Sequence, residues 1–157
     1  MRYVSNSEEE TFEIARTLGA FLKSGDSVLL YGDLGAGKSV FARGCARALG
    51  VKSEMASPSF TLMQPYKTKD LTVYHFDLYR LSGEDELYYS GLEEHIGSDG
   101  VSLIEWPQQA DVYPPRRVEV DIEKAGDPVK RVIDVALVDM DDRKQQIERA
   151  LKPFEAE

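Results

Sequence analysis

The chain has 157 residues, which is close to the usual size of one domain, and 42% of them are hydrophobic. Acidic residues outnumber basic residues by 28 to 19, so the formal net charge is −9 at pH 7. A protein that grips DNA, RNA or an anionic membrane surface by itself is normally basic, because it must neutralise phosphate charge. We therefore expect one domain over residues 1–157 that binds no DNA and no membrane.

Cysteine and histidine are too few for a disulfide framework or a metal cage. Cys45 is the one cysteine, and the two histidines, His75 and His95, lie far apart in the sequence. The N-terminal residues lack the apolar stretch of a signal peptide, and no apolar run is long enough to cross a membrane. We expect a cytoplasmic protein in which Cys45 is a small buried side chain.

The first half of the chain alternates helix and strand. A capping box at Ser7 and Glu10 predicts the start of a helix, and apolar residues at helical spacing extend it to about Lys23. The apolar run over residues 27–31 is typical of a buried strand. A glycine-rich loop follows it, and a second helix is expected over residues 38–49.

The second half of the chain is richer in strands, because it holds several runs of β-branched and aromatic residues. Together with the first half, this order predicts an α/β fold. Its sheet is expected to be parallel near the glycine-rich loop, antiparallel elsewhere and flanked by helices. The tail from about residue 139 is expected to be helical. Strands are predicted over residues 60–66, 71–76, 101–104, 118–122 and 129–138, and helices over residues 84–89 and 141–151.

The glycine-rich loop, residues 32–39, matches the phosphate-binding pattern G-x-x-x-x-G-K-[ST] at every fixed position. Its glycines let the backbone point N–H groups at an anion, and the next helix offers its positive N-terminus. Lys38 can reach the β- and γ-phosphates, and the Ser39 hydroxyl can bind Mg²⁺. We therefore predict a single P-loop NTPase domain. The expected nucleotide-binding residues are Asp33, Leu34, Gly35, Ala36, Gly37, Lys38, Ser39 and Val40.

Two carboxylates at predicted strand ends are candidate partners for the metal. Glu105 follows the strand over 101–104, and Asp77 follows the strand over 71–76. A P-loop enzyme needs such a carboxylate near its Mg²⁺, on a strand beside the loop. With Lys38, these are the predicted catalytic residues. Their spacing leaves open which carboxylate holds the metal and which orients water.

Several further motifs occur in a specific order along the chain. They are Arg43-Gly44, then Ser-Pro-Ser-Phe-Thr-Leu at residues 57–62, Tyr-His-Phe-Asp-Leu-Tyr-Arg-Leu at 74–81, and Ile-Glu-Trp-Pro at 104–107. The last two blocks are specific, whereas phosphate loops occur in many folds. Together the motifs closely resemble the TsaE (YjeE) family, ATPases of bacterial tRNA threonylcarbamoyladenosine biosynthesis. The resemblance extends over most of the chain, to about residue 133.

The resemblance implies roles for individual residues. Residues 35–39 would hold the triphosphate, with Ser39 and Glu105 as ligands of Mg²⁺. Asp77 would help to position the attacking water, and Trp106 would lie next to the site. A switch-like segment that senses the γ-phosphate would comprise Ser57, Pro58, Ser59, Phe60 and Thr61.

This sequence departs from the usual family pattern at two positions. Family members usually have threonine where this chain has Ser39 and Ser59, and each replacement keeps the hydroxyl group. The adenine pocket is expected by resemblance near residues 8–11 and near Lys130 and Arg131.

The resemblance also implies partners. Members of the family are slow ATPases that act with two proteins, the transferase of the threonylcarbamoyl group and its inactive paralogue. The ATPase would reset that complex between turnovers. It would reach tRNA only through these partners, at the adenosine beside the anticodon.

Arg80 and the residues around Tyr88 and Tyr89 can each be interpreted in two ways. Arg80 is either a phosphate or partner contact or a member of an ordinary salt bridge. Tyr88 and Tyr89, together with Leu87 and Leu92, form either a partner-facing patch or a helix face packed on the sheet.

Two other functions share the phosphate loop. A small-molecule or nucleotide kinase would carry an arginine-bearing lid, and no such segment is evident. A GTP-dependent switch would carry an Asp-x-x-Gly motif, which the sequence lacks. The segment Thr68-Lys69-Asp70-Leu71 matches the guanine-reading pattern only superficially, because its aspartate comes one position early.

Overall fold

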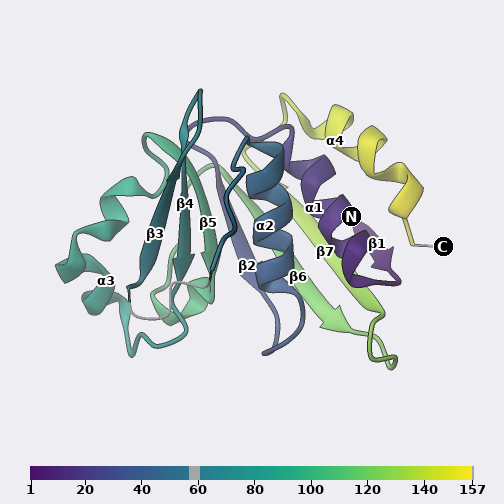
Figure 1. Ribbon diagram of the computed structural model, residues 1–157, viewed down its shortest axis with the longest axis horizontal. Helices are drawn as coiled ribbons and strands as arrows, with labels where there is room; N and C mark the ends of the chain where they lie inside the picture. The colour runs from purple at the N-terminus through teal and green to yellow at the C-terminus, as the bar shows by residue number, and fades with distance from the viewer. Residues whose placement is uncertain (57–60, 157) are drawn as a thin grey trace.

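One mixed sheet organises the computed structural model, which describes residues 1–56 and 61–156 (Figure 1). The strands are β1 (Arg2–Ser5), β2 (Ser27–Tyr31), β3 (Met63–Lys67), β4 (Thr72–Asp77), β5 (Gly100–Glu105), β6 (Arg117–Lys124) and β7 (Arg131–Val138). The helices are α1 (Glu8–Gly19), α2 (Lys38–Ala48), α3 (Glu84–Ser90) and α4 (Lys144–Leu151), with short 3₁₀ turns η1 (Leu92–His95), η2 (Pro107–Gln109) and η3 (Lys152–Phe154).

The sheet is parallel at its centre and antiparallel at its edges. Its strand order is β1-β7-β6-β2-β5-β4-β3. The central strand β2 pairs in parallel with β5 and β6, and β4 pairs in parallel with β5. The pairs β3–β4, β6–β7 and β1–β7 are antiparallel. This topology confirms the predicted fold class, and β6 and β7 form an antiparallel hairpin.

Some element boundaries differ from the predicted ones. The helix α1 begins with the expected cap, since Ser7 Oγ accepts a hydrogen bond from the N–H of Glu10 at 3.1 Å. It ends at Gly19, not near residue 23, because the next N–H groups bond three residues back, as in turns, from Phe21 to Leu18 and from Leu22 to Gly19. The helix α4 begins three residues later than expected, and the strand β1 was not predicted at all.

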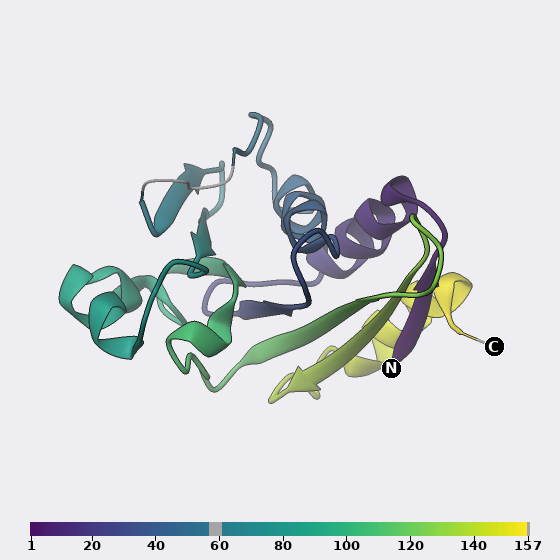
Figure 2. The same ribbon diagram turned by 90° about the horizontal axis from the view of Figure 1, so that it is seen from below.

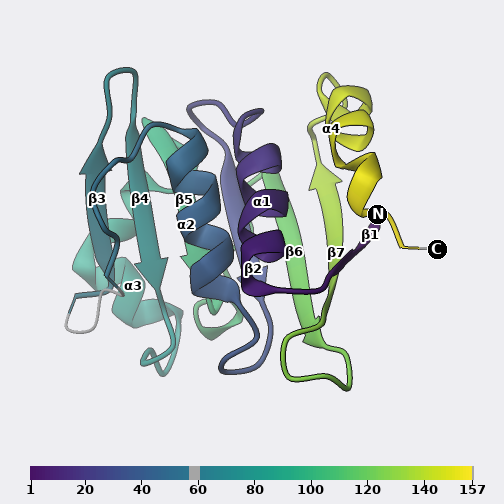
Figure 3. The ribbon, with the colours of Figure 1, turned by 45° about the vertical axis from the view of Figure 1, so that its right-hand side comes forward.

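Helices cover the two faces of the sheet unequally. The helices α1 and α2 run side by side across the central strands (Figures 2 and 3). Val28 and Leu30 of β2 face them in the main core, to which α4 adds Ile147. On the opposite face, Leu29 joins a second cluster built with side chains of α3 and of the segment after η2. Alternation along β2 therefore divides its side chains between two cores.

Close approach of α1 and α2 depends on two glycines. A Cβ on Gly44 would lie 2.6 Å from Cβ of Ala15, and a Cβ on Gly19 would lie 2.8 Å from Cα of Cys45. Either side chain would force the helices apart. Because α2 begins at the phosphate loop, this contact also fixes the position of that loop against the sheet.

The structure bears on the predicted state of Cys45 and on the question of a membrane-spanning helix. Cys45 is fully buried, and burial raises the pKa of its thiol, as expected for an unreactive side chain. In the part of the chain that the structure describes, no helix is both long enough and apolar enough to span a membrane.

Candidate functional site

The phosphate loop joins the buried strand β2 to α2 (Figure 1). Gly32, Gly35 and Gly37 have φ values of 145°, 77° and 120°, a region that favours glycine. Gly32 also lies against β6, because a Cβ there would be 2.6 Å from the carbonyl oxygen of Ile122. The motif glycines are thus required by the path of the backbone.

Lys38 lies folded back onto its own loop. Its ammonium donates hydrogen bonds to the carbonyl oxygens of Gly32 at 2.6 Å and Asp33 at 2.8 Å. The same nitrogen lies 4.3 Å from the centre of a Trp106 ring. Burial lowers the pKa of Lys38, while the negative charges of Glu105 and Asp77 oppose that shift. The structure therefore brings Lys38 and Trp106 together, as the resemblance implied.

Ser39 and Glu105 lie in direct contact. The hydroxyl of Ser39, in the first turn of α2, donates to the Glu105 carboxylate at 3.0 Å from Oε1 and 3.2 Å from Oε2. Glu105 ends β5, the parallel neighbour of β2, and its side chain is buried. A hydroxyl and a carboxylate from residues 66 positions apart thus meet beside the loop.

His75 completes this cluster, although the sequence alone did not place it in the site. Its Nε2 lies 2.6 Å from Oε2 of Glu105, and both side chains are buried. The available signal was its position on β4, because His75 and Asp77 are two residues apart and point to the same face. The parallel register then sets Asp77 directly opposite Glu105.

Asp77 is partly buried at the end of β4. Desolvation raises the pKa of its carboxyl group, and the nearby Glu105 charge raises it further. The N–H of Tyr79, which donates to Oδ1 at 3.1 Å, opposes this shift, as do His75 and Lys38. The structure therefore keeps two carboxylates close together, one held by hydrogen bonds and one raised in pKa.

The oxygen atoms gathered beside the loop could serve as ligands of a magnesium ion. Ser39, Glu105 and Asp77 offer hard oxygen ligands, which Mg²⁺ prefers. Within residues 1–56 and 61–156, no group of three or more His, Cys, Asp or Glu side chains forms a metal cage by itself. An ion held here would take its remaining ligands from water and phosphate oxygens, which is typical of nucleotide sites.

The outer side of the loop is braced by the β6–β7 hairpin. Arg131 donates from Nε to the carbonyl of Ala36 at 2.8 Å and from Nη2 to that of Gly35 at 3.3 Å. Lys124 donates to the carbonyl of Leu34 at 3.1 Å. The carbonyl oxygens of the loop carry partial negative charge and would repel a phosphate. These hydrogen bonds hold three of them to the positive side chains of Arg131 and Lys124.

A cavity of about 130 Å³ lies between α1, the loop and this hairpin. Glu8, Thr11, Val40 and Arg131 line it. Three of these fall in the two segments expected near the adenine, and Lys130 does not line the cavity. The structure brings the two segments together, and their contact with adenine stays a prediction.

Comparison with known proteins agrees with the motifs. The family model described as "Threonylcarbamoyl adenosine biosynthesis protein TsaE" matches residues 5–133. The chain belongs to the TsaE family. This family takes part in tRNA threonylcarbamoyladenosine biosynthesis, and its fold is that of a P-loop NTPase. The family expected from the motifs is therefore confirmed.

Individual TsaE relatives cover most of the chain. The TsaE of Bacillus subtilis is 38% identical over 133 residues, which are 84% of this chain and 83% of the relative. The TsaE of Rickettsia felis is 43% identical over 122 residues, 76% of this chain and 71% of the relative. A crystal structure of Bacillus subtilis YdiB superposes with a TM-score of 0.71 at 32% identity, covering 98% of this chain and 94% of that one.

The remaining residues expected from the TsaE resemblance lie in different places. Residues 57–60 of the switch-like segment, Ser57, Pro58, Ser59 and Phe60, lie outside the described residues. Thr61 is exposed, and its hydroxyl donates to the carbonyl of Met63 at 3.2 Å. Arg80 is exposed in the turn after β4.

Proposed function

We propose that this protein is a magnesium-dependent ATPase that supports the enzymes which modify tRNA with threonylcarbamoyladenosine. The single observation that carries the proposal is the contact of Ser39 with Glu105 beside the phosphate lysine. This contact supplies both protein ligands that a P-loop site offers to Mg²⁺. Membership in the TsaE family supports the pathway, and the acidic charge supports an indirect relation to RNA.

The residues of the chain divide the work of hydrolysis. Loop N–H groups and the N-terminus of α2 bind the phosphates, and Lys38 moves from its carbonyl partners to the β- and γ-phosphates. Ser39 and Glu105 hold Mg²⁺, which neutralises phosphate charge when bound. Asp77 accepts a hydrogen bond from the attacking water and aligns it with the γ-phosphorus. The water oxygen bonds to the γ-phosphorus as the bond from that phosphorus to the β–γ bridging oxygen breaks. ADP leaves with the bridging oxygen, the released phosphate keeps one proton of the water, and the other proton passes to solvent.

The partners are the threonylcarbamoyl transferase subunit and its inactive paralogue, in the cytoplasm. Hydrolysis resets their complex between turnovers, and this protein meets tRNA only through them.

A reconstituted modification reaction tests the proposal. We expect ATP hydrolysis that needs Mg²⁺, is slow alone and rises when the two partners are added. Lys38→Ala should lower both rates about 100-fold or more, because a phosphate contact is lost. The matched control is Lys144→Ala on the exposed side of α4, which should keep both rates.

Three results would contradict the proposal. Repeated modification turnovers without this protein would remove its role as a resetting factor. ADP formation only after addition of a small acceptor molecule would instead indicate a kinase. Preferential binding of GTP over ATP in competition would indicate a GTP-dependent switch.

A further inference from the structure

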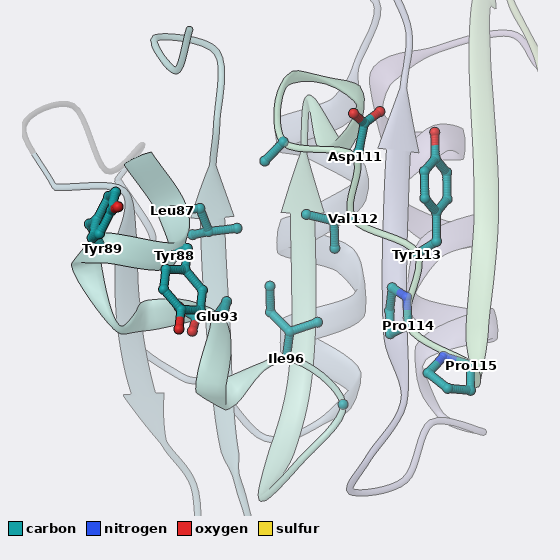
Figure 4. A pocket seen from close by; sticks show the side chains of 12 residues that line it. Leu87, Tyr88, Tyr89, Glu93, Ile96, Asp111, Val112, Tyr113, Pro114 and Pro115 are labelled. Carbon is teal, nitrogen blue, oxygen red and sulfur yellow. The ribbon is translucent and has the colours of Figure 1, made fainter. Parts of the chain in front are cut away.

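A second concave site lies on the face of the sheet opposite α1 and α2, away from the phosphate loop. It is a cavity of about 650 Å³ between α3 and η1 on one side and residues 110–115 on the other (Figure 4). We name it the tyrosine groove. Its lining includes Leu87, Tyr88, Glu93, Ile96, Val112 and Tyr113.

The groove combines a packed floor with exposed aromatic walls. Leu87 and Val112 are 3% and 9% exposed and belong to the core beneath. Tyr88, Tyr89 and Tyr113 are 67%, 84% and 55% exposed. Thus α3 packs on the sheet through Leu87, as one interpretation of this helix expected, and exposes Tyr88 and Tyr89 on its outer side. The partner-facing role of these tyrosines stays a prediction. Exposed tyrosines around an apolar floor are typical of protein-binding surfaces.

The charge of the groove indicates what kind of segment fits. Glu93 and Asp111 line it, and Oε2 of Glu93 is buried without a hydrogen-bond partner in the described structure. A buried carboxylate oxygen without a donor is costly, so a donor from outside would relieve it. Arg117, which donates to the carbonyl of Pro114 at the end of the groove, is already paired with Glu119 at 2.9 Å. The groove therefore complements a basic group.

We propose that the tyrosine groove binds a segment of the transferase complex in which an apolar side chain stands beside a lysine or arginine. The apolar side chain would cover Leu87 and Val112, and the basic group would meet Glu93. This inference rests on the proposed function for the source of the segment. Its chemistry rests on the groove alone.

One wall of the groove continues into the ATP site. Residues 106–115 begin at Trp106, beside Lys38, and end in the groove. Trp106 and Asp111 have φ values of 59° and 48°, a strained region for residues other than glycine. The side-chain amide of Gln109 donates a 3.1 Å hydrogen bond to the carbonyl of Tyr79 and so links this segment to the turn after β4. A segment bound in the groove would therefore contact the same stretch of chain that holds Trp106 against Lys38.

Binding of the full chain to the purified two-subunit transferase complex tests this inference. We expect Tyr88→Ala and Glu93→Gln each to weaken binding about fivefold or more in a calorimetric titration, and Tyr88→Phe to retain it. The charge-matched control is Glu148→Gln on the exposed side of α4, which should bind normally. Basal ATP hydrolysis should be unchanged in these variants, while hydrolysis raised by the partners should fall.

A photo-crosslinking residue at position 88 identifies the occupant. The crosslinked partner peptide should contain a lysine or arginine beside an apolar residue. A crosslink to an acidic segment or to a second copy of this chain would overturn the inference. So would normal binding by both Tyr88→Ala and Glu93→Gln while the wild type is bound and stimulated, a result that leaves the proposed function intact. A wild type that is neither bound nor stimulated would overturn both.

Discussion

His75 Nε2 lies 2.6 Å from Oε2 of Glu105, and both side chains are buried. Nδ1 of His75 is buried without a hydrogen-bond partner in the described structure. Because a carboxylate oxygen accepts, the proton in this contact lies on Nε2, which donates to Glu105. Since Ser39 donates to the same carboxylate, Glu105 is held from two sides before any ligand arrives.

Two replacements of His75 should distinguish the effect of its hydrogen bond on metal binding from the effect of its packing. His75→Leu fills the space but loses the donor, and we expect it to weaken metal binding about 10- to 100-fold, as for other partners of metal ligands. His75→Gln keeps a donor in reach of Glu105 and should retain most of the affinity. The measurement is Mn²⁺ affinity with ADP present, followed by electron paramagnetic resonance. Equal affinities of the two variants would show that the hydrogen bond has no such role.

Asp77→Asn should stabilise the fold at neutral pH. Burial and the Glu105 charge raise the folded-state pKa of Asp77 above its ordinary 3.8, so the folded protein holds this proton more tightly than the unfolded chain does. The ionised carboxylate therefore costs stability at every pH above the raised pKa. We expect the Tm without nucleotide to rise about 2 °C near pH 7.5, while hydrolysis falls.

The sign of this effect gives a second check on Asp77. Below its ordinary pKa of 3.8, the carboxyl group is protonated in the folded and the unfolded states alike. The difference in Tm between the variant and the wild type should therefore shrink as the pH falls toward that value. A gain that stays constant over this range would assign the stabilisation to another cause.

Loss of the Arg131 side chain should weaken nucleotide binding. Arg131→Met removes the bonds to the carbonyls of Ala36 and Gly35, each worth about 1 kcal/mol, so the loop loses part of its preorganised shape. We expect the calorimetric Kd for ADP to increase about threefold to tenfold. Arg2→Met, which breaks an exposed ion pair with Asp134, is the matched control. An unchanged Kd in Arg131→Met would show that the brace is not needed.

Gly44→Ala should destabilise the packing of α1 on α2. Alanine normally favours a helix over glycine, but here its Cβ would lie 2.6 Å from both Cβ of Ala15 and the carbonyl oxygen of Phe12. Overpacking of this kind costs about 1–3 kcal/mol, so the Tm should fall by about 3 °C or more. Thermal unfolding followed by circular dichroism measures it. Gly83→Ala, with no neighbour within 4 Å, should leave the Tm nearly unchanged.

The parts of the fold that the sequence predicts are those with a local cause. The phosphate loop is a contiguous motif, and β2 and β5 are apolar runs whose burial on both faces needs no knowledge of their neighbours. The strand β1 was not predicted because only four residues form it and both end residues, Arg2 and Ser5, are polar. Its partner, β7, lies about 130 residues further along the sequence, and no local sequence pattern predicts that pairing.

The same distinction holds in the site. Lys38 and Ser39 follow from the motif, and Glu105 and Asp77 follow from strand ends. The role of His75 depends on the register between β4 and β5, which only the folded sheet sets. Likewise, Arg131 reaches the loop because the β6–β7 hairpin crosses beside it, and the tyrosine groove needs three separate segments.

Trp106 is the one tryptophan of the chain, and the ammonium of Lys38 lies 4.3 Å from its ring. The tryptophan fluorescence of the protein therefore comes from a single residue, next to the group that must move when phosphates enter. Departure of the cation changes the electrostatic field on the indole and shifts its emission. The unlabelled protein thus carries its own optical reporter, with which arrival of the nucleotide can be timed separately from its hydrolysis.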